Sequence, residues 1–360
     1  MGTTSSFFGG GGGSPLPEPE WLFQKSSYTY TFPYDGVVLV HVIGAGGSGA
    51  CQYNSQGATG GGAGGYSRKQ FTVTSSTTST VTTGVGGAYS GQNVTQAVGN
   101  AGTNTTFVLS STTLTANGGG AGTQYGSNTS TGQGGSASGG DVNYTGGDSG
   151  SRGGTYQSIP MATGGGAVNL FNLNTDGGSG TNGARYAASG GGGVGGKGGD
   201  ITNNGYWQVT GGGGSNGAAP ILQNNSNNNY PQSPMGSGGS RLFLFTGSML
   251  DGIGGQGIRA KYYQGISFSP FFTVGMGAGS GGLVTSEIND TPENMHAQPA
   301  GIFGGGGGCF TGYPHGAAGG DALIGGGGGA HAYYHSTNNP QRRSGRGGDG
   351  VVIIEYIERS

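Results

Sequence analysis

The sequence predicts an all-β protein in which a small antiparallel β-sandwich carries a bundle of extended glycine-rich segments. Of the 360 residues, 92 are Gly and 13 are Pro, while only 8% are charged. The glycines gather in runs between short β-branched and aromatic segments. No apolar pattern with a period near 3.6 residues persists for three turns, so we expect almost no α-helix.

Composition also decides between an ordered and a disordered chain. Such a high content of Gly and Pro is typical of low-complexity sequences. Disordered chains, however, usually combine high net charge with few aromatic residues. This chain has a formal net charge of -2, with 18 Tyr and 14 Phe. We therefore expect order, and the missing basic footprint argues against nucleic-acid binding.

Residues 1–20 are expected to form a flexible or attachment tail. Phe7 and Phe8 precede the run Gly9–Gly13, and a Pro-rich piece follows. Glycine runs are flexible, whereas Pro-rich segments are extended and semi-rigid. The two phenylalanines are candidate residues for attachment to a partner, and a merely disordered terminus is the alternative.

Residues 21–116 should supply the N-terminal strands of the sandwich. Tyr28–Phe32 alternates with a period of two, and Val37–Ile43 is apolar on both faces, as in a central strand covered on both sides. Asp35 and Gly36 between them are typical of a hairpin turn. Further β-branched runs bounded by Gly and Ser predict strands at 69–74, 79–83, 105–109 and 112–116.

Residues 117–349 have a different texture, dominated by glycine clusters. The clusters lie at 118–120, 164–166, 190–193, 211–214, 304–308 and 325–329, without the fixed Gly-X-Y period of collagen. Polyproline-II-like helices have three residues per turn and no internal hydrogen bonds, so their N–H and C=O groups need lateral partners. Glycine lets neighbouring backbones approach on all sides. We expect a polyglycine-II bundle here, and residues 350–360 should return to the sandwich as its closing strand.

Between the glycine segments lie inserts rich in Tyr, Asn, Pro and Ser. Tyr and Trp supply rigid contact area at binding surfaces, and Asn supplies adaptable hydrogen bonds. Packing over the glycine layers is the alternative for each aromatic ring. The candidate contact residues are Tyr206, Trp207, Tyr230, Tyr313, His315, Tyr333, Tyr334 and His335.

The motifs of catalysis and cofactor binding are missing or out of context. Gly44–Gly49 matches GxGxxG formally, but a poor helix former follows it and no acidic residue lies between Asp35 and Asp141. His331 and His335 are four residues apart, yet the flanking glycines oppose the helix that a metal pair of this spacing requires. We expect no enzyme activity, cofactor or metal.

Two further features bear on the cellular context. Cys51 and Cys309 lack the spacing of a zinc site. The sequence leaves open whether the two cysteines form a disulfide. The N-terminus lacks a basic region followed by an apolar stretch, and no apolar run reaches the length of a membrane span. We expect synthesis in a cytoplasm without classical secretion.

Both ends of the chain resemble a known family. The segments YTYTFPYDGVVLVHVIGAGGSGA, GGAGGYSRKQFTVT and TTGVGG, with the closing GGDGVVIIEYIE, are similar to the glycine-rich domain of bacteriophage tail-fibre and tail-tip proteins. The middle resembles, in texture only, the polyglycine-II receptor-binding adhesins of T-even-type phages. The resemblance implies that the terminal strand pairs with Val37–Ile43. The turn Pro33–Gly36 is one residue longer than the commonest turn of the family.

The resemblance implies a virion protein made in the host cytoplasm, probing a host outer-membrane protein or surface glycan through its inserts. Its expected partners are other fibre, tail or baseplate proteins, and a homotrimer is one assembly open to it. A structural decoration without a ligand, as a head fibre, baseplate or tail part, is the alternative, and a glycan-active enzyme is a third. Some animal receptor kinases carry a similar lattice, but the missing signal peptide, membrane span and cysteine framework argue against that branch.

Overall fold

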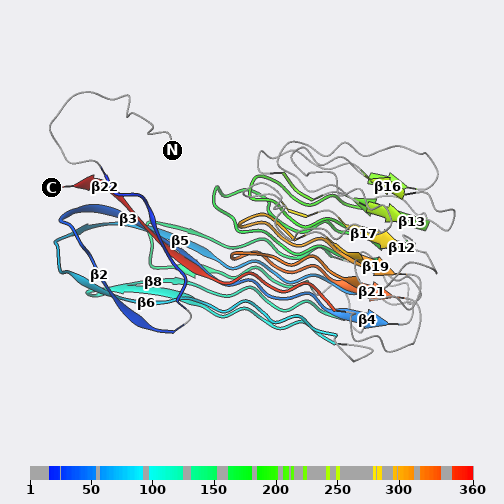
Figure 1. Ribbon diagram of the computed structural model, residues 1–360, viewed down its shortest axis with the longest axis horizontal. Coiled ribbons are helices and arrows are strands. Elements are labelled where there is room, and N and C mark those ends of the chain that lie inside the picture. Colours follow the sequence, from blue (N-terminus) through cyan, green and yellow to red (C-terminus); the bar gives the residue numbers. More distant parts are fainter. Residues whose placement is uncertain are drawn as a thin grey trace, which may run out of the picture.

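The computed structural model shows a β-sandwich from which long extended segments run side by side to a second group of short strands (Figure 1). No α-helix occurs in the described part of the chain, and none of its segments is a helix that could span a membrane. The structure describes residues 16–24, 26–53, 57–91, 97–124, 131–151, 161–180, 185–201, 206–210, 212–214, 222–224, 241–243, 249–251, 279–280, 282–285, 295–297, 299–311, 317–333 and 343–359.

The sandwich consists of two antiparallel five-stranded sheets. The first sheet contains, in spatial order, β1 (Glu20–Leu22), β22 (Val351–Arg359), β3 (Gly36–Ile43), β5 (Tyr66–Val73) and β10 (Val142–Tyr144). The second sheet contains β2 (Tyr28–Thr31), β6 (Thr78–Thr82), β7 (Thr105–Leu109), β8 (Thr112–Ala116) and β9 (Ala137–Ser138). The all-β prediction is therefore confirmed.

The apolar core lies between these two sheets. Alternate residues of each strand point inward, because successive side chains of a strand lie on opposite faces. Val38, Val40 and Val42 of β3 are fully buried against Phe107 of β7 and Leu114 of β8. β3 is central in its sheet, between β22 and β5, and its intervening residues are half-buried, so its second face is covered less completely than its core face.

The closing strand pairs as the family resemblance implied. β22 lies antiparallel to β3, in a register that runs from Val351 opposite Ile43 to Arg359 opposite Gly36. The register shifts between Tyr356 and Glu358, next to Gly36. A Cβ atom on Gly36 would lie 2.2 Å from the carbonyl oxygen of Glu358, so this irregular end of the pair requires glycine.

The hairpin expected at Asp35 and Gly36 is wrong. β2 and β3 belong to different sheets, and the chain changes sheet at these residues. The Asp35 carboxylate accepts a hydrogen bond from the main-chain N–H of Ser75 instead of closing a local turn. A two-residue turn signal is local, and here the pairing of β2 with β6 overrides it.

The sandwich and the glycine-rich region are interleaved in the sequence. The chain first leaves the sandwich at Gly44, directly after β3, and it still adds β9 and β10 to the sandwich after residue 117. The predicted division at residue 116 therefore does not separate the two regions. The early segments 44–50, 59–65, 84–91 and 97–104 all belong to the glycine-rich bundle.

We call each extended segment between the sandwich and the far end a pass. In a pass, consecutive N–H groups donate to different neighbours in rotation, and every third N–H returns to the same neighbour. This rotation is that of a helix with three residues per turn, as in polyproline II. In pass 44–50 these bonds are 2.8 to 3.2 Å long. Every third N–H counted from Gly44 donates to pass 59–65. The N–H groups counted in the same way from Ala45 and from Gly46 donate to passes 97–103 and 345–348, respectively.

The carbonyl groups of the same pass accept from other neighbours. Their partners lie in passes 87–90, 119–122 and 328–331. Pass 44–50 therefore has three neighbours on its donor side and three on its acceptor side, whereas a β-strand has at most two within its sheet. The passes form a lattice bonded in three directions.

Glycine is required in this lattice for close approach rather than for unusual backbone angles. Only four described glycines have a positive φ: Gly36, Gly91, Gly139 and Gly325. A Cβ on Gly46 would lie 1.9 Å from the carbonyl oxygen of Gly326, and one on Gly327 would lie 1.9 Å from that of Gly61. These distances leave no room for a side chain of any kind.

The number of packed faces explains the irregular glycine clusters. In outer pass 97–104, Gly99 and Gly102 face the interior, where an added Cβ would meet main-chain oxygens at 2.2 and 2.3 Å. Val98 and Ala101, which face outward, are exposed. A pass with one packed face thus needs glycine at every third position, whereas the central pass 44–50 has glycine at two of every three positions.

Replacing Gly87 with Ala tests this requirement. The new Cβ would lie 2.0 Å from the carbonyl oxygen of Asn100, which accepts a lattice bond from the Ser48 N–H. We expect Gly87→Ala to lower the free energy of unfolding by at least about 2 kcal/mol, measured by urea denaturation. The matched control Ala88→Ser changes the exposed neighbour in the same pass and should stay within about 0.5 kcal/mol of the parent protein. Equal stability of the two variants would contradict the lattice.

Candidate functional site

At the tip, defined as the end of the bundle opposite the sandwich, the described ends of outgoing and returning passes lie together (Figure 1). Residues flanking different turns are brought together there by bridges between Cys51 and Ala97, Gly180 and Ile201, and Ala318 and Arg343. The segments that connect these ends along the chain lie outside the described residues; they include 54–56, 92–96, 125–130, 152–160, 181–184, 202–205, 312–316 and 334–342. Loops that are far apart in the sequence therefore start and finish at one end.

Beneath these loops the passes become short, mostly parallel strands. One sheet contains β11 (Met161–Ala162), β12 (Arg185–Ala188), β13 (Tyr206–Thr210) and β14 (Leu222–Asn224). The other contains β16 (Met249–Asp251), β15 (Arg241–Phe243), β17 (Leu283–Thr285), β19 (Cys309–Thr311), β21 (His331–Tyr333) and β4 (Cys51–Tyr53). A separate pair joins β18 (Met295–His296) to β20 (Ala317–Ala318).

A core of small residues holds the two tip sheets together. Phe310 is its one large side chain among the described residues, and all of its members have an exposed fraction of 0%. The other members are Ala50, Ala58, Ala162, Ala188, Val209, Ala330 and Ala332. Alanine methyl groups let the sheets approach closely, so the loop ends are carried on a tightly packed base.

Buried hydroxyl groups bridge separate passes just below the tip. Thr163 Oγ1 accepts from the N–H of Gly60 at 3.1 Å and donates to the carbonyl oxygen of Gly150 at 2.7 Å. Each bridge satisfies one donor and one acceptor that the lattice would otherwise leave buried and unpaired.

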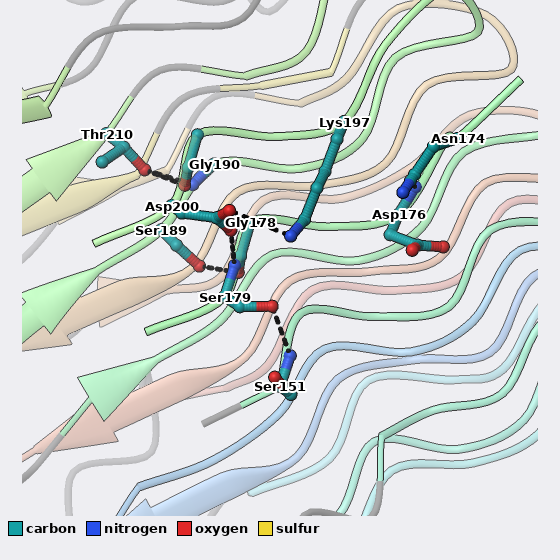
Figure 2. Close-up of polar contacts among 11 residues, drawn as sticks. Ser151, Asn174, Asp176, Gly178, Ser179, Ser189, Gly190, Lys197, Asp200 and Thr210 are labelled. Carbon is teal, nitrogen blue, oxygen red and sulfur yellow. Dashed lines mark hydrogen bonds and ion pairs between the residues drawn. The ribbon is translucent and has the colours of Figure 1, made fainter. Parts of the chain in front are cut away.

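The bridge recurs at equivalent positions of neighbouring passes (Figure 2). Ser189 joins the N–H of Gly164 to the carbonyl of Gly178 in the same way. Thr210 accepts from the N–H of Gly190 at 3.1 Å and donates to the carbonyl of Gly199 at 2.5 Å. The parallel register of the preceding residues, Ala162, Ala188 and Val209, aligns the three hydroxyl groups.

These hydroxyl bridges were not predicted from the sequence, although the sequence contains a signal for them. Thr163, Ser189 and Thr210 each directly precede a glycine run and follow a small or β-branched apolar residue. This repeated pattern could have been identified from the sequence. Its role could not, because the bonded carbonyls lie in other passes.

A row of chemically reactive residue types lies across the second tip sheet. Cys309, His331 and Cys51 occupy one register on three adjacent strands, and all three have an exposed fraction of 0%. His331 Nδ1 lies 3.8 Å from Cys51 Sγ, and Nε2 lies 3.3 Å from Thr311 Oγ1. The row is part of the interior, where the His331 ring also stacks on the ring of Tyr333 at 5.5 Å between centroids.

The two cysteines are free thiols, so the disulfide that the sequence left open does not form in this structure. β21 lies between their strands, which places their Cα atoms roughly 9.6 Å apart, whereas a disulfide requires at most about 7 Å. Burial, and secondarily the nearby Cys51, raises the pKa of the Cys309 thiol far above its ordinary value. In the part of the chain that the structure describes, no group of three or more His, Cys, Asp or Glu side chains could hold a metal ion.

Carboxylates accept hydrogen bonds from main-chain N–H groups of neighbouring passes (Figure 2). Asp200 Oδ1 accepts from the N–H of Ser179 at 2.6 Å while its other oxygen pairs with Lys197 Nζ at 3.0 Å. Asp176 Oδ1 accepts from the N–H of Asp148 at 2.9 Å. Burial raises the pKa of the Asp176 carboxyl, the bond from the Asp148 N–H opposes this shift, and the charge of Asp148 adds to it. These two carboxylates therefore act as hydrogen-bond acceptors for the main chain within the lattice.

The structure describes some of the predicted contact residues and not others. Tyr206 and Trp207 lie at the tip end of β13, the strand that follows segment 202–205. Tyr333 has an exposed fraction of only 1%, so its ring packs inside the tip, and its interpretation as a displayed contact is corrected. The other candidates, Tyr230, Tyr313, His315, Tyr334 and His335, lie outside the described residues, as do Phe7 and Phe8 of the leader.

Replacing Thr163 with Val tests the hydroxyl bridges. Valine has nearly the shape of threonine but leaves the Gly60 N–H and the Gly150 carbonyl without this partner. We expect a loss of about 3 kcal/mol in the free energy of unfolding, measured by urea denaturation. Thr163→Ser keeps the hydroxyl and should lose only about 1 kcal/mol for the buried methyl group. A valine variant as stable as the serine variant would show that the bridge contributes nothing.

Comparison with known proteins places nearly the whole chain in one family. A family model described as a glycine-rich domain matches residues 23–357, a range that includes both the sandwich and the bundle. None of the curated proteins matches the chain. Because the matched range begins directly after β1 and extends nearly to the end of β22, it agrees with the interleaving of the two regions. The chain belongs to the glycine-rich domain family.

Proposed function

We propose that this protein is a bacteriophage virion adhesin that binds a receptor on the host cell surface with the loops of its tip. The observation that carries the proposal is the gathering of loop ends from across the sequence at one end of a rigid bundle. Sequence changes in such loops leave the lattice bonds unchanged, because those bonds lie in the passes. A surface of this kind can vary in specificity without loss of fold.

The lattice supports binding through preorganisation. Its passes are fixed by main-chain hydrogen bonds in three directions, so the loop ends cannot shift independently. Fixing a binding surface before contact lowers the entropy lost on association. The receptor chemistry that we propose is an outer-membrane protein or a surface glycan, met by Tyr, Trp, Asn and His side chains in the tip segments.

The opposite end is suited to attachment. β1, which follows the leader, and β22, which ends the chain, lie side by side in the sandwich, away from the tip. We propose that this end faces the virion, with Phe7 and Phe8 among its attachment residues and fibre, tail or baseplate proteins as partners. The alternative interpretation is a decoration protein without a receptor. In that case the aromatic residues of the tip only pack against the fold, as Tyr333 does.

Binding of the purified, labelled protein to a panel of bacterial strains tests the proposal. We expect saturable binding to some strains and a block of phage adsorption there. The variant Tyr334→Ser with His335→Ser should weaken binding at least about 10-fold if these residues are interface anchors. The matched control is Phe171→Ser, which removes an aromatic ring with an exposed fraction of 65%.

Phe171 follows Leu170, which packs against the cluster containing Ile43 and Tyr66 on the sandwich side, so its loss should leave tip binding unchanged. All variants must keep the unfolding midpoint of the parent protein. Absence of binding to every host that a virion carrying this protein infects would refute the adhesin and favour the decoration protein. Turnover of a host polysaccharide would indicate a glycan-active enzyme instead.

A further inference from the structure

A stack of three aromatic rings lies on the outer face of the sandwich. Trp21 lies between Phe23 and Phe303, with ring centroids 6.1 and 6.0 Å away and interplanar angles of 24° and 13°. Phe303 is buried, but Trp21 and Phe23 have exposed fractions of 37% and 46%. We call these three rings the aromatic stack. Its open side presents apolar surface to solvent.

The strand register explains why the stack is exposed. Leu22 of β1 points into the sandwich core, so its neighbour Trp21 must point to the outer face. There Trp21 is in register with Ile353 of β22, which packs with Phe303. β1 is the edge strand of its sheet. The stack therefore lies at a sheet edge, directly beside the point where the N-terminal leader joins the fold.

The leader has the composition of a segment that would cover this stack. Residues 1–15 lie outside the described part of the chain, which begins at Leu16. Residues 1–13 contain no charged side chain, and Phe7 and Phe8 are their only aromatic residues. Their burial against apolar rings would carry no cost of removing a charge from water.

The leader is long enough for Phe7 and Phe8 to reach the stack, but it cannot continue β1 as a paired strand. Eight residues separate Phe8 from Leu16, a reach of up to about 27 Å, while the five residues from Leu16 to Trp21 span at most about 17 Å. Pro17 and Pro19 lack the N–H needed to continue the ladder of β1 along β22. Contact by the leader must therefore come from side chains, and Phe7 and Phe8 are the apolar pair within reach.

We propose that Phe7 and Phe8 of the leader dock on the aromatic stack of the same chain. Offset-stacked and edge-to-face ring pairs add to the gain from area burial. The short tether through Gly9–Gly13 gives the two rings a millimolar effective concentration at the stack, so that even a weak contact is populated. Docking shields the stack in the free protein until another partner takes the leader or the stack. The inference does not depend on receptor binding by the tip.

Tryptophan fluorescence tests the docking. The chain has only two tryptophans, so Trp207→Phe leaves Trp21 as the single reporter. In this background, Phe7→Ser with Phe8→Ser should raise the acrylamide quenching constant of Trp21 about twofold, as expected when a populated cis contact is lost. The matched control Thr3→Ala with Thr4→Ala changes the same leader without touching an aromatic residue and should leave quenching unchanged.

The outcomes separate the occupants of the stack. Equal quenching of the serine variant and its parent, with the same unfolding midpoint, would overturn the proposal. Protection of Trp21 that disappears on dilution would also overturn it and assign the stack to the leader of a second copy. Addition of a free peptide of residues 1–13 to the serine variant should restore protection at high peptide concentration. Failure of the peptide to do so would contradict direct contact between the leader and the stack.

Discussion

The structure depends on one constraint: a backbone whose hydrogen-bonding groups point outward in three directions must be satisfied by neighbours that approach within main-chain contact. At the glycine positions of the lattice a Cβ atom would occupy the space of a neighbouring carbonyl, as the 1.9 Å separation between an added Cβ on Gly46 and the Gly326 oxygen shows. Ordering so much glycine costs conformational entropy. The lattice bonds, the hydroxyl bridges at Thr163 and its equivalents, and the sandwich core offset that cost together.

The fold class and the presence of the closing strand could be predicted because their signals are local, whereas the pairing of that strand with β3 was implied by the family resemblance. The alternation in Tyr28–Phe32 and the apolar run Val37–Ile43 indicate strands regardless of which other strands they pair with. The hairpin at Asp35 was wrong because strand pairing is decided by distant segments. The interleaving of the sandwich and the bundle was missed for the same reason: glycine runs indicate passes but do not indicate which strand each pass follows.

The candidate site was predictable in part. Turn-rich inserts indicated loops, but their gathering at one end follows from the out-and-back course of the passes, which sequence cannot supply. Tyr333 shows the limit for single aromatic residues, since its ring stacks on His331 in the interior. Tyr and His side chains thus pack in the interior of the tip, and in our proposal other Tyr and His side chains of the tip segments bind the receptor.

Hydrogen exchange at the central pass 44–50 tests the account most directly. Its amides, such as those of Gly46 and Gly47, bond to passes that are remote in sequence, so they should open only when the whole domain unfolds. The account predicts that these glycine amides exchange as slowly as the amides of β3 in the sandwich core. Exchange of the glycine amides at the rate of an unfolded chain, while β3 stays protected, would contradict the lattice.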